Sequence, residues 1–445
     1  MRKYFFPGLK KWLLFIILGI LVVLFGLALI FKAHPVTRIA QFIWNSLSYI
    51  ADHVPATISG VVVITLGFAF LLYAFFRANK QILNLVAPEE SSLLETLDRA
   101  HMDKRGLKVV SIGGGTGMSN MLRGLKKYTS NITAIVTVAD DGGSSGRLRE
   151  SMDMVPPGDI RNCIAALSYD DEVITQLFQY RFDEDAPEDL QNHSFGNLFL
   201  TALVELGGSK NMADAVKQAC RILKTRGLVL PVSNDSMMIK ALLEDGREVI
   251  GESNIPKANG RIKKLYCEGE VPPVLEEAIQ AIKEAEIIVL GPGSLYTSVI
   301  PNLLVPELVK EIAASPALKI YVCNVMTQPG ETDNYQVSDH LAAVQDHVED
   351  HTNSIKNIIN FVIANNSEPH KKNLEHYQKD GQYPVRIDEQ AIKAYDLKLY
   401  PTNLLQKGNL VRHNPYKLAK AIMEIYSKTL RAKNTAVREL IKAKV

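Results

Sequence analysis

Near the amino terminus, the hydrophobic positions form two long runs without any charge. The first covers Trp12 to Phe31, about 20 residues or roughly 30 Å as a helix. The second covers Ile58 to Phe76, with only Ser59 and Thr65 as polar breaks. Because each run is long enough to cross a bilayer, the pattern predicts a two-helix transmembrane hairpin in residues 1–76.

Basic residues flank this predicted hairpin and indicate on which side of the membrane its two ends lie. In membrane proteins, cytoplasmic loops carry an excess of Lys and Arg. Here more basic residues flank the hairpin than lie in its loop. The flanking residues are Arg2, Lys3, Lys10, Lys11, Arg77 and Lys80, and those in the loop are Lys32 and Arg38. We therefore expect a multi-pass protein of the cell membrane with both termini in the cytoplasm. A cleaved signal peptide fits less well, because the apolar run is too long and no small-x-small cleavage pattern follows it. Between the runs, residues 40–50 fit an interfacial helix and a plain loop equally.

After a polar linker at 77–106, which contains one predicted helix at Ser91–His101, the pattern changes. Short runs rich in β-branched residues alternate with amphipathic stretches over residues 107–445. Alternating strands and helices predict an α/β domain, with a parallel sheet that helices cover on both faces. The predicted strands are Lys108–Ile112, Thr133–Ala139, Glu286–Leu290, Lys319–Cys323 and Ile358–Ala364.

Composition narrows the class of protein. Charged residues make up 22% and hydrophobic residues 47% of the 445 positions, which excludes a largely disordered chain. The net charge of +2 argues against a dedicated nucleic-acid binder, which carries a strongly basic face. The cysteines are scattered and lack zinc-ligand spacing, so we expect reduced thiols at Cys163, Cys220, Cys267 and Cys323.

A glycine-rich loop follows the first predicted strand. It reads Gly113, Gly114, Gly115, Thr116, Gly117 and opens a helix, where free backbone N–H groups attract a phosphate. It does not fit G-x-G-x-x-G, because position 118 is Met, and it lacks the lysine of a P-loop. By itself the loop indicates an anion or nucleotide, or only a tight turn.

Two adjacent carboxylates, Asp140 and Asp141, end the second predicted strand. Asp140 stands where a doubly wound fold places its ribose-binding acid, and the pair also suits a hard cation such as Mg²⁺. An Asp-Gly turn in a solvated loop is the alternative. Further along, Asp159 is expected to cap a helix, and His193–Asn197 is expected to cap the helix at 198–206.

Another polar loop follows the strand at 286–290, with main-chain donors and hydroxyls at Gly291, Gly293, Ser294, Tyr296 and Ser298. Asn324–Thr332 follows the next strand in the same way. In an open α/β sheet such strand ends lie on one side and hold the ligand. Several polar loops after different strands therefore predict a ligand site more strongly than any one loop does.

In this order, the segments IGGGTG, TVADDGGSSGRLR, PPGDIRN, GNLFL, GPGSLYTSVIPNLLV and NVMTQPGET resemble those of the YvcK-type gluconeogenesis factors, within the CofD-like superfamily. The resemblance covers Lys108 to Ser427. It implies a Rossmann-like, doubly wound α/β fold and binding of a UDP-sugar, notably UDP-N-acetylglucosamine. It also implies a role in cell shape, cell-wall precursor supply and gluconeogenic growth. Many members lack the hairpin found here.

The resemblance also implies which residues border the nucleotide. These are Gly113–Gly117, Asp140, Asp141, Asn197, the loop from Gly291 to Ser298, Tyr377 and Arg412. Tyr377 would stack on uracil or donate its hydroxyl, and Arg412 would fork onto the diphosphate. Without the resemblance, both read as ordinary surface residues.

The sequence and the resemblance leave three candidate functions for this chain. The first is a membrane-anchored UDP-sugar-binding regulator without an assigned catalytic residue. The second is a CofD-like transferase that moves a phospholactyl-type group to a deazaflavin with Mg²⁺. The third, an NAD-dependent dehydrogenase, is disfavoured by the broken glycine motif. The sequence leaves open whether turnover occurs, whether the chain forms a homo-oligomer and which protein partner reads the bound state.

Overall fold

The computed structural model describes residues 106–169, 172–208 and 211–443, together with isolated positions between 38 and 73. Two compact units, Met1–Asp98 and Arg99–Val445, divide the chain. The predicted hairpin and the helix expected at Ser91–His101 lie outside the described residues. Within the described part, no helix combines the length and apolar character that a membrane crossing requires. The described positions between 41 and 49 are helical, which favours the helix over the plain loop there.

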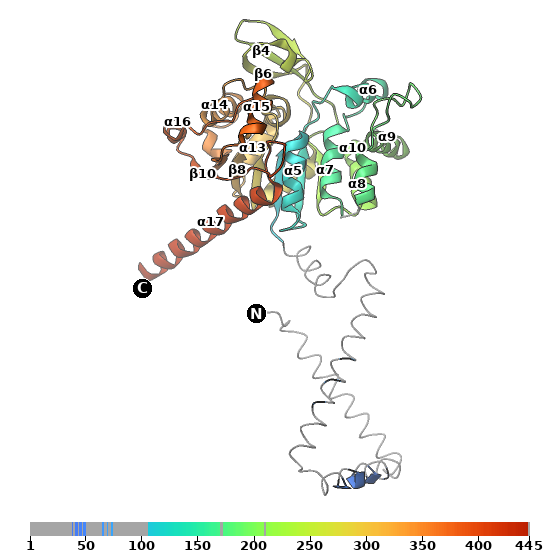
Figure 1. The fold of residues 1–445 in the computed structure, drawn as a ribbon. Coiled ribbons are helices and arrows are strands. Elements are labelled where there is room, and N and C mark those ends of the chain that lie inside the picture. The colour runs from blue at the N-terminus through green and yellow to red at the C-terminus, as the bar shows by residue number, and fades with distance from the viewer. Residues whose placement is uncertain are drawn as a thin grey trace. The chain divides into compact units, whose positions relative to one another are not determined.

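A seven-stranded sheet, parallel throughout, forms the centre of the second unit (Figure 1). The five predicted strands are all present, although their ends shift and β2 stops at Val136. Two further strands, β3 and β10, close the edges. In spatial order the strands are β10 (Lys398–Thr402), β9 (Phe361–Asn365), β8 (Leu318–Val322), β7 (Ile287–Leu290), β1 (Val109–Gly113), β2 (Ile132–Val136) and β3 (Leu228–Pro231).

Helices cover this sheet. The helix α5 packs against α7 and α17, and α11 packs against α13. The helices are α5 (Gly115–Leu125), α6 (Gly143–Met152), α7 (Gly158–Leu167), α8 (Glu172–Gln179), α9 (Phe195–Gly207), α10 (Met212–Ile222), α11 (Glu276–Glu284), α12 (Ile300–Leu303), α13 (Pro306–Ala314), α14 (Val337–Val348), α15 (Lys371–Lys379), α16 (Glu389–Ala394) and α17 (Pro415–Ala443). Shorter helical turns occur at Ile255–Ala258, Leu295–Val299 and Ile355–Asn357.

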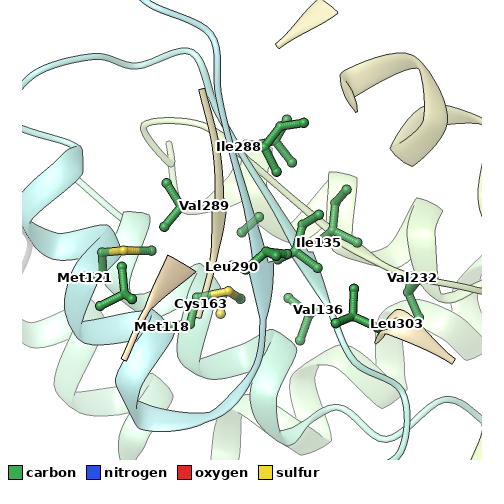
Figure 2. Close-up of a cluster of buried hydrophobic side chains, with 14 of the residues drawn as sticks. Met118, Met121, Ile135, Val136, Cys163, Val232, Ile288, Val289, Leu290 and Leu303 are labelled. Atoms are coloured by element: carbon green, nitrogen blue, oxygen red, sulfur yellow. The ribbon is translucent and has the colours of Figure 1, made fainter. Parts of the chain in front are cut away.

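The hydrophobic core lies between the sheet and these helices. Every residue of β1 and of β7 is buried, as expected for a parallel strand covered on both faces. Figure 2 shows part of this core, where Met118 and Met121 of α5 lie near Cys163 of α7 and Val289 of β7. The apolar alternation seen in the sequence therefore corresponds to one continuous core.

A small antiparallel sheet is inserted between β3 and β7. It consists of β5 (Glu248–Ile250), β4 (Met238–Leu243) and β6 (Ile262–Glu268) in that order. His347 of α14 attaches this sheet to the main body, because its Nε2 accepts a hydrogen bond from the Leu265 N–H at 2.8 Å. The sequence analysis did not predict this insertion.

The strand order changes direction beside β1. From β1 the chain proceeds outward to β2 and β3, then returns to β7 on the other side of β1 and continues to β10. Such a switch point is where doubly wound folds bind their ligands. The loops that follow β1 and β7 are the glycine loop and the Gly291–Ser298 loop, so both lie at the switch point.

Candidate functional site

The glycine loop is closed by an acidic residue of the chain itself. Gly115, at φ +67°, opens α5, and its N–H donates to Asp159 Oδ2 at 2.6 Å. A Cβ on Gly114 would lie 2.4 Å from the same oxygen, so only glycine fits there. The expectation that Asp159 caps its own helix is wrong: Pro157 is the N-cap of α7, and Asp159 lies in its first turn.

The two loops at the switch point are packed directly on each other. A Cβ on Gly117 would lie 2.8 Å from the Pro292 carbonyl oxygen, and one on Gly293 would lie 3.0 Å from that of Gly114. Asn302 of α12 ties both loops, since its Nδ2 donates to the Gly113 and Ser298 carbonyl oxygens at 3.3 and 2.9 Å. These glycines therefore serve close backbone packing.

Within the Gly291–Ser298 loop, the side chains have different surroundings. Ser294 Oγ accepts a hydrogen bond from Gln328 Nε2 at 2.7 Å, which links this loop to the one after β8. Tyr296 is 2% exposed, and its hydroxyl is 2.9 Å from that of Tyr335. The Tyr296 hydroxyl is thus satisfied inside the core, whereas Thr116 of the glycine loop is exposed.

Asp140 and Asp141 are adjacent in sequence but hold different parts of the structure. Asp140 Oδ1 accepts from the Gly142 N–H at 2.9 Å, within its own loop. Asp141 Oδ1 accepts from the Ser253 N–H at 2.8 Å, which ties the loop after β2 to the inserted sheet. The two carboxylates therefore accept hydrogen bonds from different segments of the chain.

Several acidic side chains lie near the hydrogen bond between Asp141 and Ser253. Glu252, next to Ser253, is partly buried, and burial together with the charges of Asp140 and Asp141 raises its pKa to about 8. Burial and Asp140 raise the pKa of Asp159 to about 6, and burial raises that of Glu331 to about 7. Among the described residues, no three acidic, His or Cys side chains come close enough to form a metal cage.

Asn197 belongs to a buried hydrogen-bond chain. Ser194 is the N-cap of α9, as the sequence predicts, and its Oγ accepts from the Asn197 N–H at 3.3 Å. Asn197 Nδ2 donates to Ser144 Oγ at 2.9 Å, and Ser144 Oγ lies 3.0 Å from His193 Nδ1. Because Ser144 accepts from Asn197, its own proton is available to His193, so the network joins the start of α6 to the start of α9.

The two tail residues lie close together, near the loop that follows β8. Tyr377, on α15, accepts the Val411 N–H at 3.1 Å through its hydroxyl and packs beside the small apolar cluster that includes Val325 and Val411. Arg412 follows Val411, and its Nε donates to Gln406 Oε1 at 3.1 Å. In the described part of the chain, its two terminal guanidinium nitrogens have neither a hydrogen bond nor an ion pair.

A surface pocket borders this pair. It lies between the start of α15 and the loop before Arg412, and its lining includes His370, Asn373, Gln406 and Val411. Gln406 lines the pocket and also accepts from Arg412, so the Arg412 side chain is adjacent to an open concave surface. Neither Tyr377 nor Arg412 lines this pocket itself, and their assignment to a ligand stays a prediction.

The predicted site residues therefore form two groups. The loops after β1, β2 and β7 meet at the switch point. Tyr377 packs near Val325, after β8, and Arg412 directly precedes His413, whose carbonyl oxygen accepts a hydrogen bond from α5. The sequence analysis missed Glu252, Glu331 and the structural role of Asp159. Asp159 belongs to the PPGDIRN segment, so the sequence had drawn attention to it. No local signal in the sequence places Glu252 near Asp140 and Asp141.

Comparisons with known proteins agree with this architecture. The family model described as "2-phospho-L-lactate transferase CofD" matches residues 109–405. A protein of Nostoc sp. is 45% identical over 429 residues, which are 95% of this chain and 92% of its own. The "Gluconeogenesis factor" of Bacillus subtilis is 43% identical over 319 residues, 72% of this chain and 98% of its own.

A solved structure shares the fold. A crystal structure of a Bacillus halodurans protein is 44% identical and superposes with a TM-score of 0.67, covering 71% of this chain and 99% of that one. The conserved length in these shorter relatives matches the α/β unit alone. The chain therefore belongs to the CofD family and, within it, to the YvcK-type gluconeogenesis factors.

Proposed function

We propose that this gluconeogenesis factor is a regulator that binds a UDP-sugar, UDP-N-acetylglucosamine, at the carboxyl edge of its sheet. The observation that carries the proposal is the Tyr377–Arg412 pair. Arg412 is held through Nε, while its terminal nitrogens have no partner among the described residues, which suits a fork onto a diphosphate. Tyr377 is fixed by the Val411 N–H and offers its ring to a base.

The test is a titration of the full chain with UDP-N-acetylglucosamine. A charge-assisted hydrogen bond contributes about 1.5–3 kcal/mol, so Arg412→Ala should weaken binding roughly ten- to a hundredfold. Because Arg412 is only partly buried, the melting temperature of the ligand-free protein should stay nearly unchanged. The exposed Arg386→Ala serves as a matched control and should bind like the wild type. Equal affinity of both variants would contradict the proposal.

The transferase alternative has one specific observation in its favour besides the family description. Asp140, Asp159 and Glu252 all have raised pKa values, first because of burial and then because of neighbouring carboxylates, and a bound cation would stabilise their charged forms. Mg²⁺ sites commonly combine one or two carboxylates with substrate phosphates. Asp140, with Glu252 or Asp159, would then hold the ion, which would neutralise charge on a transferred phosphoryl group.

Chelation separates the two functions. A UDP-sugar sensor should bind its ligand almost equally well in EDTA, while Asp140→Ala weakens binding through loss of a ribose contact. A CofD-like transferase should instead lose all deazaflavin-dependent turnover in EDTA. Magnesium-dependent transfer of a phosphorylated group to a deazaflavin by the purified protein would overturn the sensor assignment.

The membrane hairpin and the cellular role belong to the same proposal. The two uncharged runs and their basic flanks would anchor the regulator with both termini in the cytoplasm, where cell-wall precursors are made. The bound UDP-sugar would then report precursor supply during gluconeogenic growth and influence cell shape. A reporter fused after Val445 that is active only outside the cytoplasm would contradict this topology.

A further inference from the structure

The last helix, α17, continues well past the hydrophobic core that it helps to form. Among its described side chains, Ile425 is the last buried one, at 1% exposed, whereas its backbone stays helical to Ala443. The residues after Ile425 therefore add roughly 27 Å of helix at 1.5 Å per residue. Figure 1 shows this end of α17, in red, extending away from the body of the second unit.

The end of α17 carries a strong positive charge. Residues 426–445 contain one acidic residue, Glu439, and six basic ones, which are Lys428, Arg431, Lys433, Arg438, Lys442 and Lys444. The whole chain has 50 basic and 48 acidic residues, so its small positive excess comes entirely from this stretch. A helix with such a block of basic residues is typical of proteins that bind anionic lipid surfaces.

The basic stretch begins at the edge of the sheet where the chain enters the second unit. Glu286 directly precedes β7, and its Oε2 accepts a hydrogen bond from the Lys108 N–H at 3.1 Å, just before β1. Its Oε1 accepts from the Tyr426 hydroxyl of α17 at 2.8 Å. One carboxylate at the amino edge of the parallel sheet therefore joins the entry of the chain to the start of the basic stretch.

Apolar surface accompanies the charge at this edge. Leu430 is 46% exposed. Together with Tyr426, Pro316 and Ala317 it lines a surface depression of about 220 Å³. Helices that lie on membranes combine exposed apolar side chains with Lys and Arg, so this edge offers both components.

We propose that residues 426–445, the end of α17, bind the anionic lipid surface of the cytoplasmic membrane. The inference rests on the proposed membrane anchor in residues 1–76, because the chain that comes from this anchor enters the second unit beside Tyr426. A nucleic acid fits less well, since outside this stretch the chain has no excess of basic residues. Contact through the amino edge would leave the switch point, at the carboxyl edge, open to soluble ligands.

Energy transfer between the end of α17 and the bilayer tests the proposal. The full chain, with a fluorophore attached after Val445, is reconstituted into vesicles that carry an acceptor dye on their headgroups. We expect stronger transfer in vesicles that contain phosphatidylglycerol than in vesicles of phosphatidylcholine alone. High salt should abolish the difference, because it screens the attraction between exposed charges.

A charge variant shows whether α17 causes the response. It combines Arg431→Gln, Lys433→Gln, Arg438→Gln and Lys442→Gln. Each basic residue near an anionic surface strengthens binding roughly fivefold, so this variant should bind the surface at least about a hundredfold more weakly. Because glutamine favours helices and these residues follow Ile425, the melting temperature should stay that of the wild type.

The matched control removes four exposed cations elsewhere in the second unit. It combines Arg221→Gln, Lys224→Gln, Lys257→Gln and Lys263→Gln. Its net charge equals that of the charge variant, but its lipid response should equal that of the wild type. A response lost equally in both variants would show general charge attraction and would overturn the proposal.

Other outcomes would overturn it as well. These are equal transfer in the two kinds of vesicle, an unchanged response in the charge variant, and binding of duplex RNA without any lipid response. Alkaline carbonate tests the anchor separately, since it removes proteins without a transmembrane segment from vesicles. A chain that carbonate extracts lacks the proposed anchor, yet it must still bind phosphatidylglycerol vesicles through α17.

Discussion

At the scale of single residues, the glycines of the loop after β1 serve packing. Gly114 leaves room for Asp159, and Gly117 leaves room for Pro292, where in each case a Cβ would lie within 3 Å of an oxygen. The Gly115 N–H, which a phosphate would use at a helix start, already donates to Asp159. A negative carboxylate at that position disfavours a phosphate there, which is why the diphosphate is assigned to Arg412 instead.

Glu331 gives a residue-scale prediction about pH. It is 5% exposed and accepts from Thr297 Oγ1, yet burial raises its pKa from 4.5 to about 7. The folded protein therefore holds this proton more tightly than the unfolded chain does. Its contribution to the free energy of unfolding falls as pH rises from about 4.5 to about 7, and it stays low above that.

Glu331→Gln removes this titration while it keeps a hydrogen-bond acceptor for Thr297. From pH 5 to pH 8, the wild type should lose on the order of 2 kcal/mol of unfolding free energy relative to the variant. Urea unfolding at the two pH values measures the difference. The exposed Glu307→Gln on α13 is the control and should follow the wild-type profile. Parallel pH profiles for Glu331→Gln and the wild type would contradict the assignment.

At the scale of elements, α17 packs against α5, the helix that begins at the glycine loop. Asn120 of α5 donates to the His413 carbonyl oxygen at 2.6 Å, directly before α17. Gly124 of α5 lies against the first residue of α17, where a Cβ would be 2.0 Å from the Pro415 carbonyl oxygen. The helix that opens at the glycine loop therefore also positions the segment that carries Arg412.

Gly124→Ala tests this contact. The added methyl group has no room, so α17 must shift, and the free energy of unfolding should fall by about 1–3 kcal/mol. The control is Gly207→Ala at the end of α9, where a Cβ would meet nothing within 4 Å. There alanine should leave stability unchanged or raise it by up to about 1 kcal/mol, because it has the higher helix propensity. Equal stabilities in urea unfolding would show that α5 and α17 do not touch closely.

At the scale of the whole molecule, the α/β unit is a complete folding unit. Its core is continuous, and the Bacillus subtilis relative aligns over 319 residues, nearly its whole length. The match to the Nostoc protein spans more residues than Arg99–Val445 contains, so that relative shares part of the N-terminal segment too. The N-terminal segment is thus an addition to a unit that the Bacillus subtilis relative has without it.

A chain that begins at His101 should therefore be soluble and fold without the N-terminal unit. Its melting temperature should match that of the α/β unit in the full chain, since the core lies wholly after this residue. Calorimetry of both proteins in detergent makes the comparison. Aggregation of every chain that starts between 99 and 106 would place the boundary elsewhere.

The sequence by itself determined the periodic features. Strands β1, β2, β7, β8 and β9 followed from runs of β-branched residues, and the α/β class with a parallel sheet followed from their alternation with helices. The Rossmann-like, doubly wound arrangement came from the family resemblance. The polar loops that meet at the switch point also followed, because parallel strand ends share one edge. The short edge strands β3 and β10 and the inserted sheet carry weaker local patterns and were missed.

Only the tertiary structure decided which charges face one another. Glu252 lies more than a hundred residues from Asp140, and Arg161 is separated from His193 by α8, so no spacing rule connects them. Their pKa shifts arise from burial and from through-space charge. Local sequence determines propensity and periodicity, whereas burial and electrostatics depend on distances that exist only after the chain has folded.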